Sequence, residues 1–258
     1  MIDLFMNWDS TRSNILSRIP GLILGMFSST LKGSYTDSLR GSYTDSLWSL
    51  LDTTQVSRMQ AEIRLKIAED IANDEIETAL ALSREALRQA EILGSKALIA
   101  DAKLAIGGFY DYLGVKVEAI EYLEEALDAF EQLGIPDKEA RALMLIGNAY
   151  WYLNQFEAAL KYYTRASVIG YALNDTILII SGINAKGAVY GNTGQRDSAI
   201  ILFREAKELA MQVDSRNQVI LAYYNIGDAN LHEGRIDDAL GIFNDLEKNY
   251  DIERYSTK

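Results

Sequence analysis

The sequence predicts an all-α fold in which helical hairpins follow one another along the chain. Only 2 prolines occur in 258 residues, so helices are almost uninterrupted. Two sets of positions keep a 40-residue period: the glycines Gly107, Gly147, Gly187 and Gly227, and the residues Gly94, Gly134, Asn174 and Asp214, which tolerate a left-handed backbone. Such a period indicates an array of similar units rather than one central core.

Residues of fixed size follow each glycine of the first set. An alanine stands twelve residues later, at Ala119, Ala159, Ala199 and Ala239, with Ala79 one period earlier. A large apolar residue stands sixteen residues later, at Leu123, Tyr163, Phe203 and Phe243. Glycine inside a helix costs about 1 kcal/mol relative to alanine. We therefore expect the glycines to admit a second helix at close range beside these alanines, as structural positions of the repeat.

A second set of turns divides each unit into two helices. The first helix ends at Gly114, Asn154, Gly194 and Gly234. The expected pairs are Val56–Ala72 with Glu75–Leu93, Lys96–Leu113 with Lys116–Leu133, Asp137–Leu153 with Phe156–Leu173, Thr176–Thr193 with Arg196–Val213, and Arg216–Glu233 with Ile236–Tyr250.

These residues resemble the tetratricopeptide repeat (TPR) family. "LIGNAY" in the third unit matches the apolar residue, glycine and aromatic of the family's first helix, and "AALKYYTRA" matches the alanine, aromatic and alanine of the second. The resemblance covers about residues 56–250 and implies a right-handed α-solenoid of five tandem hairpins, whose first helices line a concave groove. Armadillo or HEAT helices, which share the longer period, are the alternative.

Two departures from the family pattern stand out. The family's usual period is 34 residues, whereas this chain keeps 40, like the longer-helix repeats of bacterial sensor and scaffold proteins. The first unit has Ile67 and Asp70 where glycine and an aromatic are expected, so we expect it to be a degenerate amino-terminal cap.

The resemblance implies that the groove binds peptides or partner helices. The expected partner-binding residues are Arg141, Met144, Asn148, Trp151, Tyr152, Asn184, Tyr224, Asn225 and Asp228, with Asp101, Asp111, Tyr112 and Ser181 at equivalent positions. The aromatics would supply contact area and the asparagines would bond a partner's backbone. The alternative is that the aromatics pack between adjacent units.

The charge balance narrows the class of partner. Lys+Arg 25 against Asp+Glu 37 gives a net charge of −12, which disfavours nucleic acids and direct binding to anionic membranes. Acidic residues on the second helices, such as Glu121, Glu124, Glu125 and Asp128, are interpreted as a solvated face, with an acidic docking surface as the alternative. Some members of the family bind an acidic carboxyl tail through several lysines and arginines in the groove. Among the expected groove positions of this chain only Arg141 is a lysine or arginine, so this activity is not supported.

The chain lacks the usual parts of a catalytic site. It has no cysteine and a single histidine, His232, which is expected at a helix end. The residues that usually form a transition-metal site or a histidine-based triad are therefore largely missing. Gly107 and Gly108 lie in a helix without the lysine of a phosphate-binding loop. We therefore predict no enzyme activity, no cofactor and no metal.

Residues 1–55 are expected to form a leader and linker, and residues 251–258 a tail. The heptapeptide "GSYTDSL" occurs twice, at Gly33–Leu39 and at Gly41–Leu47. It is interpreted as a duplicated linker, with a functional serine-threonine element as the alternative. The second copy leads into a short helix that is expected to pack on the first hairpin. The apolar run Arg18–Phe27 is too short to span a bilayer. The predicted location is cytoplasmic, or periplasmic or membrane-associated if residues 12–30 act as a signal segment.

Together these observations predict a non-catalytic scaffold that binds a protein or peptide in its groove. The alternative is the input region of a bacterial sensor kinase or transcription regulator whose output domain is absent from this chain. Self-association through the carboxyl-terminal repeat edge is a further expectation, because terminal repeats normally need a polar cap.

Overall fold

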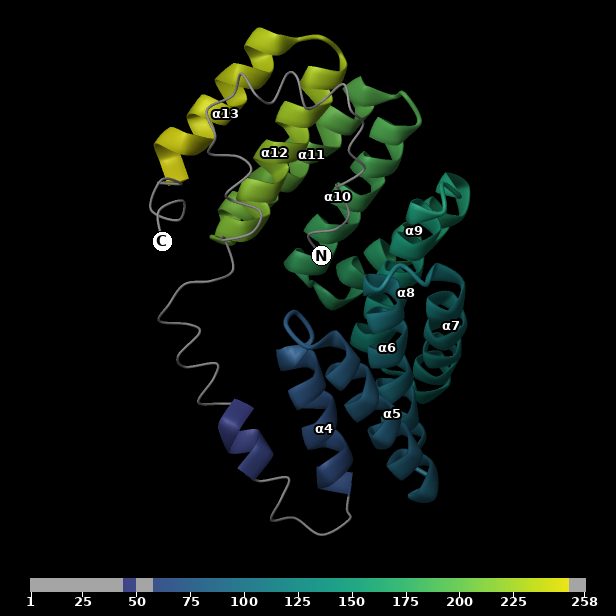
Figure 1. The fold of residues 1–258 in the computed structure, drawn as a ribbon. Coiled ribbons are helices and arrows are strands. Elements are labelled where there is room, and N and C mark those ends of the chain that lie inside the picture. Colours follow the sequence, from purple (N-terminus) through teal and green to yellow (C-terminus); the bar gives the residue numbers. More distant parts are fainter. Residues whose placement is uncertain (1–43, 50–57, 251–258) are drawn as a thin grey trace.

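The computed structural model describes residues 44–49 and 58–250, and these ranges contain helices and no strands (Figure 1). A short helix spans residues 44–49. The remaining helices, in chain order, are α4 (Arg58–Ile71), α5 (Ile76–Ile92), α6 (Lys96–Tyr112), α7 (Lys116–Leu133), α8 (Pro136–Tyr152), α9 (Phe156–Leu173), α10 (Thr176–Asn192), α11 (Arg196–Gln212), α12 (Arg216–His232) and α13 (Ile236–Tyr250).

The predicted map of five hairpins is confirmed. Every predicted helix end that falls in the described residues lies within one residue of the observed end. At the start of α8 the helix begins at Pro136 rather than Asp137, because proline fits the first helical position, where no hydrogen-bonded N–H is needed. The expected leader apart from residues 44–49, its boundary with the array at residue 56, the first heptapeptide copy and the tail lie outside the described residues.

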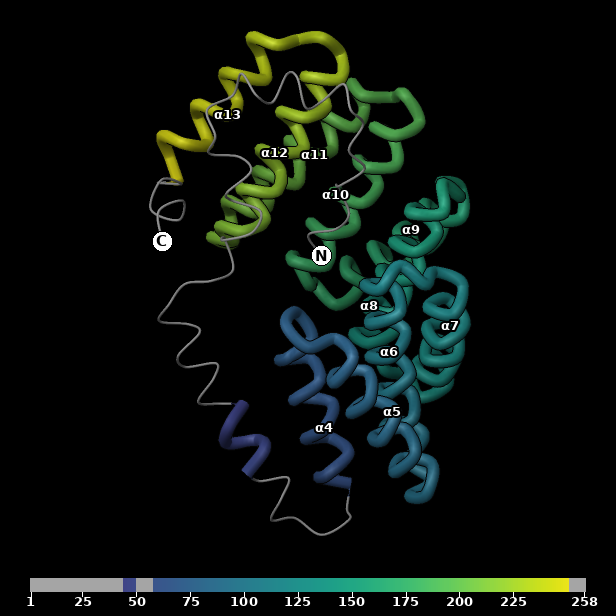
Figure 2. The backbone as a smooth tube through the Cα atoms, viewed as in Figure 1, coloured from purple at the N-terminus to yellow at the C-terminus, as the bar shows by residue number. Residues whose placement is uncertain are grey.

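The helices form two curved layers. Consecutive helices pack against each other along the whole array, and the first helices of neighbouring units also contact one another, α4 with α6, α6 with α8, α8 with α10 and α10 with α12. The second helices in the described array lack contacts of this extent. The array therefore curves toward the first helices (Figure 2). We call the surface formed by α4, α6, α8, α10 and α12 the inner face.

The residues predicted to end the helices adopt the left-handed conformation. Positive φ angles occur at Gly94, Gly114, Gly134, Gly194 and Gly234 and at three non-glycine residues, Asn154 (59°), Asn174 (53°) and Asp214 (52°). Asparagine and aspartate replace glycine there because their short polar side chains tolerate this region best among the other residues. These turns reverse the chain between helices and keep each unit at 40 residues.

Each repeat glycine lies under the large residue sixteen positions later. A Cβ added to Gly147 would stand 2.6 Å from Cε1 of Tyr163, and one added to Gly187 would stand 2.5 Å from Cε1 of Phe203. Gly107 has the same relation to Leu123, and Gly227 to Phe243. Because real Cβ atoms do not approach so closely, only glycine permits this packing.

The first unit reverses the size pattern. Ile67 stands at the glycine position and is fully buried, and Ser83 replaces the large residue sixteen positions later and is also fully buried. The repeat positions therefore hold a large residue on α4 and a small one on α5, the reverse of the order in the other units. The first unit is therefore packed by the same principle as the others.

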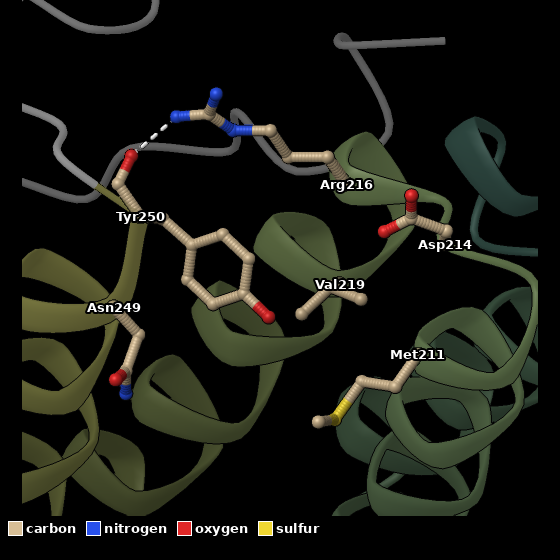
Figure 3. A pocket seen from close by; sticks show the side chains of 6 residues that line it. All are labelled: Met211, Asp214, Arg216, Val219, Asn249 and Tyr250. Carbon is tan, nitrogen blue, oxygen red and sulfur yellow. Dashed lines mark hydrogen bonds between the residues drawn. The ribbon is translucent and has the colours of Figure 1, made fainter.

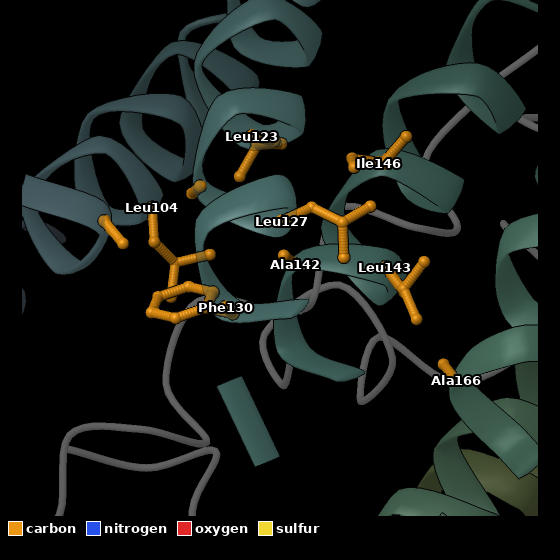
Figure 4. Close-up of a cluster of buried hydrophobic side chains, with 10 residues drawn as sticks. Leu104, Leu123, Leu127, Phe130, Ala142, Leu143, Ile146 and Ala166 are labelled. Atoms are coloured by element: carbon orange, nitrogen blue, oxygen red, sulfur yellow. The ribbon is translucent and has the colours of Figure 1, made fainter. Parts of the chain in front are cut away.

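The apolar core is continuous across units. The cluster between the second and third units joins α6, α7, α8 and α9 through buried side chains (Figure 4). Its fully buried members include Leu123, Phe130, Leu143 and Ile146. Because neighbouring hairpins share one cluster, each unit depends on the next for its burial.

The interface between the third and fourth units is more polar than the others. Lys186 occupies the position that is a fully buried isoleucine in the second, third and fifth units, at Ile106, Ile146 and Ile226. Burial lowers the pKa of Lys186, with the Glu205 carboxylate opposing that shift. Beside it, a Cβ on Gly182 would stand 2.2 Å from Oγ of Ser167, which is itself buried. A lysine, a glycine and a serine thus lie at this interface in addition to its apolar cluster of Trp151, Ala159, Tyr163, Ala185, Ala188 and Val189.

The short helix 44–49 packs on the first hairpin, as predicted for the segment after the second heptapeptide copy. Leu47 is buried against Ile63 and Ile67 of α4, with Trp48 beside it. Residues 44–47 of this helix belong to the heptapeptide, so the helix is not confined to the segment after it. Leu47 therefore covers apolar side chains at the amino-terminal end of the array.

Candidate functional site on the inner face

Three charged inner-face positions have partners of opposite charge. Asp101 Oδ1 lies 2.6 Å from Lys138 Nζ, and Asp111 Oδ1 lies 2.7 Å from Lys116 Nζ. Arg141 Nη2 lies 2.9 Å from Glu69 Oε1, which joins α8 to α4 of the first unit. The second and third units thus neutralise these inner-face charges internally.

The Asp111–Lys116 pair forms part of a larger contact. Both side chains are only 14% exposed. Lys116 Nζ lies 4.0 Å from the ring centroid of Tyr152, which is a cation–π contact. Tyr152 in turn meets Trp151 edge-on, with ring centroids 5.1 Å apart. One wall of the inner face is therefore built from a salt bridge and two aromatic rings.

Trp151 packs between units rather than presenting its ring to solvent. It is 8% exposed and lies in a cluster with Tyr163 of α9 and Ala185, Ala188 and Val189 of α10. Tyr152 and Met144 are half-buried. Tyr112, at the position equivalent to Tyr152, is 52% exposed, so it offers more accessible aromatic surface than Trp151.

The asparagines lie in different surroundings. Asn148 Oδ1 accepts a hydrogen bond of 2.9 Å from the Tyr163 hydroxyl, whose pKa is raised by burial. Asn184 is 4% exposed and its Nδ2 donates to Gln218 Oε1 at 3.4 Å, across α10 and α12. Asn225 is 5% exposed. The amides of α10 and α12 are therefore buried rather than displayed.

Three polar atoms of these residues lack a hydrogen-bond partner among the described residues: Trp151 Nε1, Asn184 Oδ1 and Asn225 Nδ2. A buried polar group without a partner costs about 1–3 kcal/mol. Native structures contain few such groups, and each calls for an explanation. Trp151 Nε1 and Asn225 Nδ2 are donors, and Asn184 Oδ1 is an acceptor. A peptide backbone carries both the acceptors and the donors that such atoms need.

The fifth unit differs from the others. Tyr224 is half-buried beside Phe243, with ring centroids 6.0 Å apart, and burial raises its pKa to about 12. Asp228 is exposed, and its Oδ2 lies 3.6 Å from His232 Nε2 at the end of α12. This unit places a carboxylate at the far end of the inner face.

The sequence did not reveal the partners of the charged residues. Glu69, Lys116 and Lys138 complete the three ion pairs, and Gln218 contacts Asn184, yet none was among the predicted residues. Gln218 does carry a signal, because an amide stands where the second unit has the buried Leu98.

A cavity of about 380 Å³ lies away from these residues, near the carboxyl end of α13 (Figure 3). Its lining comes from the α11–α12 turn, the first turn of α12 and the end of α13: Met211, Asp214, Arg216, Val219, Asn249 and Tyr250. The Arg216 guanidinium donates to the carbonyl oxygen of Tyr250 across its mouth. The sequence did not predict this cavity.

The described residues contain no group of three side chains suited to hold a metal ion. Within the same residues, every helix is too short or too polar to cross a bilayer. The arrangement of the inner face offers contact surface and hydrogen-bonding groups.

Comparison with known proteins finds a family match over part of the array. Residues 98–167 match the family model described as tetratricopeptide repeat. No curated protein matches the chain.

Several solved structures share the fold. BtubC (BKLC) from P. vanneervenii has 20% identity and a TM-score of 0.66, with 82% of this chain and 88% of that chain covered. A Rap protein complexed with Competence and Sporulation Factor has 14% identity and a TM-score of 0.70, over 81% and 59%.

A longer protein also resembles this chain. The signal transduction ATPase PH0952 from Pyrococcus horikoshii, described as having a tetratricopeptide repeat sensor, has 13% identity and a TM-score of 0.71 over 89% of this chain and 35% of that one. This chain thus spans about a third of PH0952 and three fifths of the Rap protein. At these identities the likeness establishes the fold alone.

Proposed function

We propose that the array is a non-catalytic scaffold whose inner face binds a segment of a protein or peptide. The match of residues 98–167 to the tetratricopeptide repeat model and the shared fold of the other hairpins support this proposal. The surface runs along α6, α8, α10 and α12. The accessible contact residues are proposed to be Arg141, Met144, Asn148, Tyr152, Tyr224 and Asp228, together with Tyr112. Trp151, Asn184 and Asn225 are buried, and they are proposed to contact the segment only after the side chains that cover them move.

The unpaired polar atoms of Trp151, Asn184 and Asn225 carry this proposal. An extended peptide backbone supplies carbonyl oxygens for Trp151 Nε1 and Asn225 Nδ2 and an N–H for Asn184 Oδ1. Because the three atoms are covered, binding requires neighbouring side chains to turn aside. The hydrogen bonds gained would offset the cost of leaving these groups unpaired.

Two of the similar structures fit this proposal. The Rap protein is described in complex with Competence and Sporulation Factor, and the repeats of PH0952 are described as a sensor. The sensor-input alternative assigns the same inner face to signal reception and differs only in the response that binding triggers.

Capture from the native cell tests the proposal, with two tyrosines as matched variants. Tyr112 on α6 is 52% exposed and Tyr171 on α9 is 58% exposed, so both can be replaced by alanine at small cost to folding. We expect Tyr112→Ala to lose partners that the wild-type chain and Tyr171→Ala both retain, as identified by mass spectrometry. Loss with Tyr171→Ala alone would place binding on the second helices and refute the proposal.

Self-association through the last repeat is a second proposal. Leu240 of α13 is 39% exposed, whereas its equivalents Ile120 and Ile200 are 9% and 6% exposed because a following unit covers them. Sedimentation should show a concentration-dependent dimer that Leu240→Glu abolishes. A monomer at all concentrations contradicts it.

A further inference from the structure

We propose that the inner face selects a partner segment whose central side chains are uncharged. This inference rests on the proposed function, because it names the chemistry of the segment bound there. It follows from the way in which the array has already paired or removed the charges along this surface.

The charges of the second and third units are engaged. The Asp101–Lys138, Asp111–Lys116 and Arg141–Glu69 pairs have atom separations of 2.6, 2.7 and 2.9 Å. Each pair sums to zero charge. The Arg141–Glu69 pair is exposed and contributes little. At the more shielded Asp101–Lys138 and Asp111–Lys116 pairs, a charged ligand side chain must either displace one member of the pair or stay without a counter-charge, and both cost free energy.

The Asp111–Lys116 pair is the least replaceable of the three. Both side chains are largely shielded from water, and Lys116 also donates to the backbone carbonyl of Asp111 at 2.6 Å while it covers the Tyr152 ring. Displacing Lys116 would break three contacts at once. A basic ligand residue therefore cannot easily take its place.

The fourth unit removes charge from the centre of the inner face. α10 has one charged residue, Lys186, and the charged group that influences it is Glu205 on the second helix α11. The inner-face positions of α10 are Ser181, Asn184 and Asn192. Next to them, α8 contributes Met144, Asn148 and Tyr152, which are also neutral.

A charged side chain placed against α8 and α10 would lose water and gain no ion pair. Apolar, amide and hydroxyl side chains suffer no such loss, because tyrosine, methionine and amide groups can pack with them or hydrogen-bond to them. The net charge of −12 would by itself favour a basic ligand, so selection of a neutral one reflects local pairing rather than the overall field.

Binding of three fluorescein-labelled pools of degenerate nine-residue peptides tests the inference by fluorescence anisotropy. The three pools have the same flanking positions and differ at the three central positions. These carry a mixture of Leu, Phe, Ser and Asn in the neutral pool, Lys in the second pool and Glu in the third. We expect the neutral pool to bind roughly tenfold or more tightly than the Lys and Glu pools. A charged pool that binds as tightly as the neutral pool overturns the inference and leaves the proposed function standing. No binding by any pool contradicts the proposed function and the inference with it.

One variant tests the pairing itself. Lys138→Met leaves Asp101 without its partner, and the Lys pool should then bind roughly threefold or more tightly than it binds the wild type, with the neutral pool unchanged. The control is Lys161→Met, an exposed position on the second helix α9. Circular dichroism checks that both variants are folded. An unchanged Lys pool with folded Lys138→Met overturns the inference.

Discussion

The ring of Tyr163 lies directly over Gly147, so closely that a Cβ on the glycine would stand 2.6 Å from ring atom Cε1. The same relation recurs in three other units, between a first-helix glycine and the large residue sixteen positions later. This contact sets how near the two helices of a hairpin approach, and the stability of the array should depend on it.

Gly147→Ala should destabilise the protein by about 1–3 kcal/mol, because the added methyl group overpacks against Tyr163. The effect opposes helix propensity, which favours alanine. Gly108→Ala is the matched control, since its Cβ would meet only Leu145 Cδ1 at 3.8 Å, and it should be neutral or stabilising by up to about 1 kcal/mol. Urea denaturation measures both, and equal stability of the two variants would disprove the packing argument.

The reversed pair in the first unit predicts coupling between two positions. Ile67→Gly should cost at least about 3 kcal/mol through the cavity it leaves, and Ser83→Leu should destabilise by overcrowding. Together they recreate the pattern of Gly107 and Leu123, so the double variant should be more stable than the sum of the single effects. A double-mutant cycle by urea denaturation checks this, and additive effects would mean that the two side chains do not share one space.

Much of the fold was predictable because the size of the residue at each repeat position reflects how closely the two helices pack there. The left-handed turn residues fixed the helix ends, and the glycine-to-large spacing fixed the face on which the two helices meet. The reversed Ile67 and Ser83 pair obeys the same rule, and a search for size exchange at a spacing of sixteen residues would have found it.

The candidate site was harder to predict because its contacts join distant parts of the chain. Arg141 meets Glu69 only because the array curves enough to bring α8 within reach of α4. Trp151 occupies a repeat position shared with Asp111, yet its ring packs against α10, where the small residues Ala185 and Ala188 leave room. The repeat spacing predicts whether a residue lies on the first or the second helix of its unit. Whether its side chain is exposed depends on the residues of the neighbouring unit.

Lys186→Ile should stabilise the protein by roughly 1–3 kcal/mol, because isoleucine restores the apolar contact found at this position in the second, third and fifth units. The lowered pKa of Lys186 means that its charged form costs stability below the unfolded-state pKa, so the gain should be present at pH 7. Lys161→Ile, at an exposed position of α9, is the control and should change little. Thermal melting compares the two, and a lower melting temperature for Lys186→Ile would contradict the expectation.

Alkaline pH should destabilise the array. Burial, reinforced by Glu124, raises the pKa of Tyr162 to about 12, and burial raises that of Tyr224 to about 12. The folded state therefore holds these protons more tightly than the unfolded state, whose tyrosines titrate near pH 10. Their contribution is complete below about pH 10 and is lost as the pH rises toward 12.

Urea midpoints measured from pH 8 to pH 12 test this, and Tyr162→Phe combined with Tyr224→Phe should flatten the decline. A decline of the same size in the double phenylalanine variant would assign it to other groups.

The central claim, that the inner face receives the partner, is tested most directly by hydrogen–deuterium exchange of the chain with and without its captured partner. The first helices α6, α8, α10 and α12 should exchange more slowly in the complex, while the exposed faces of α7, α9 and α11 stay unchanged. Protection confined to the second helices would contradict the account.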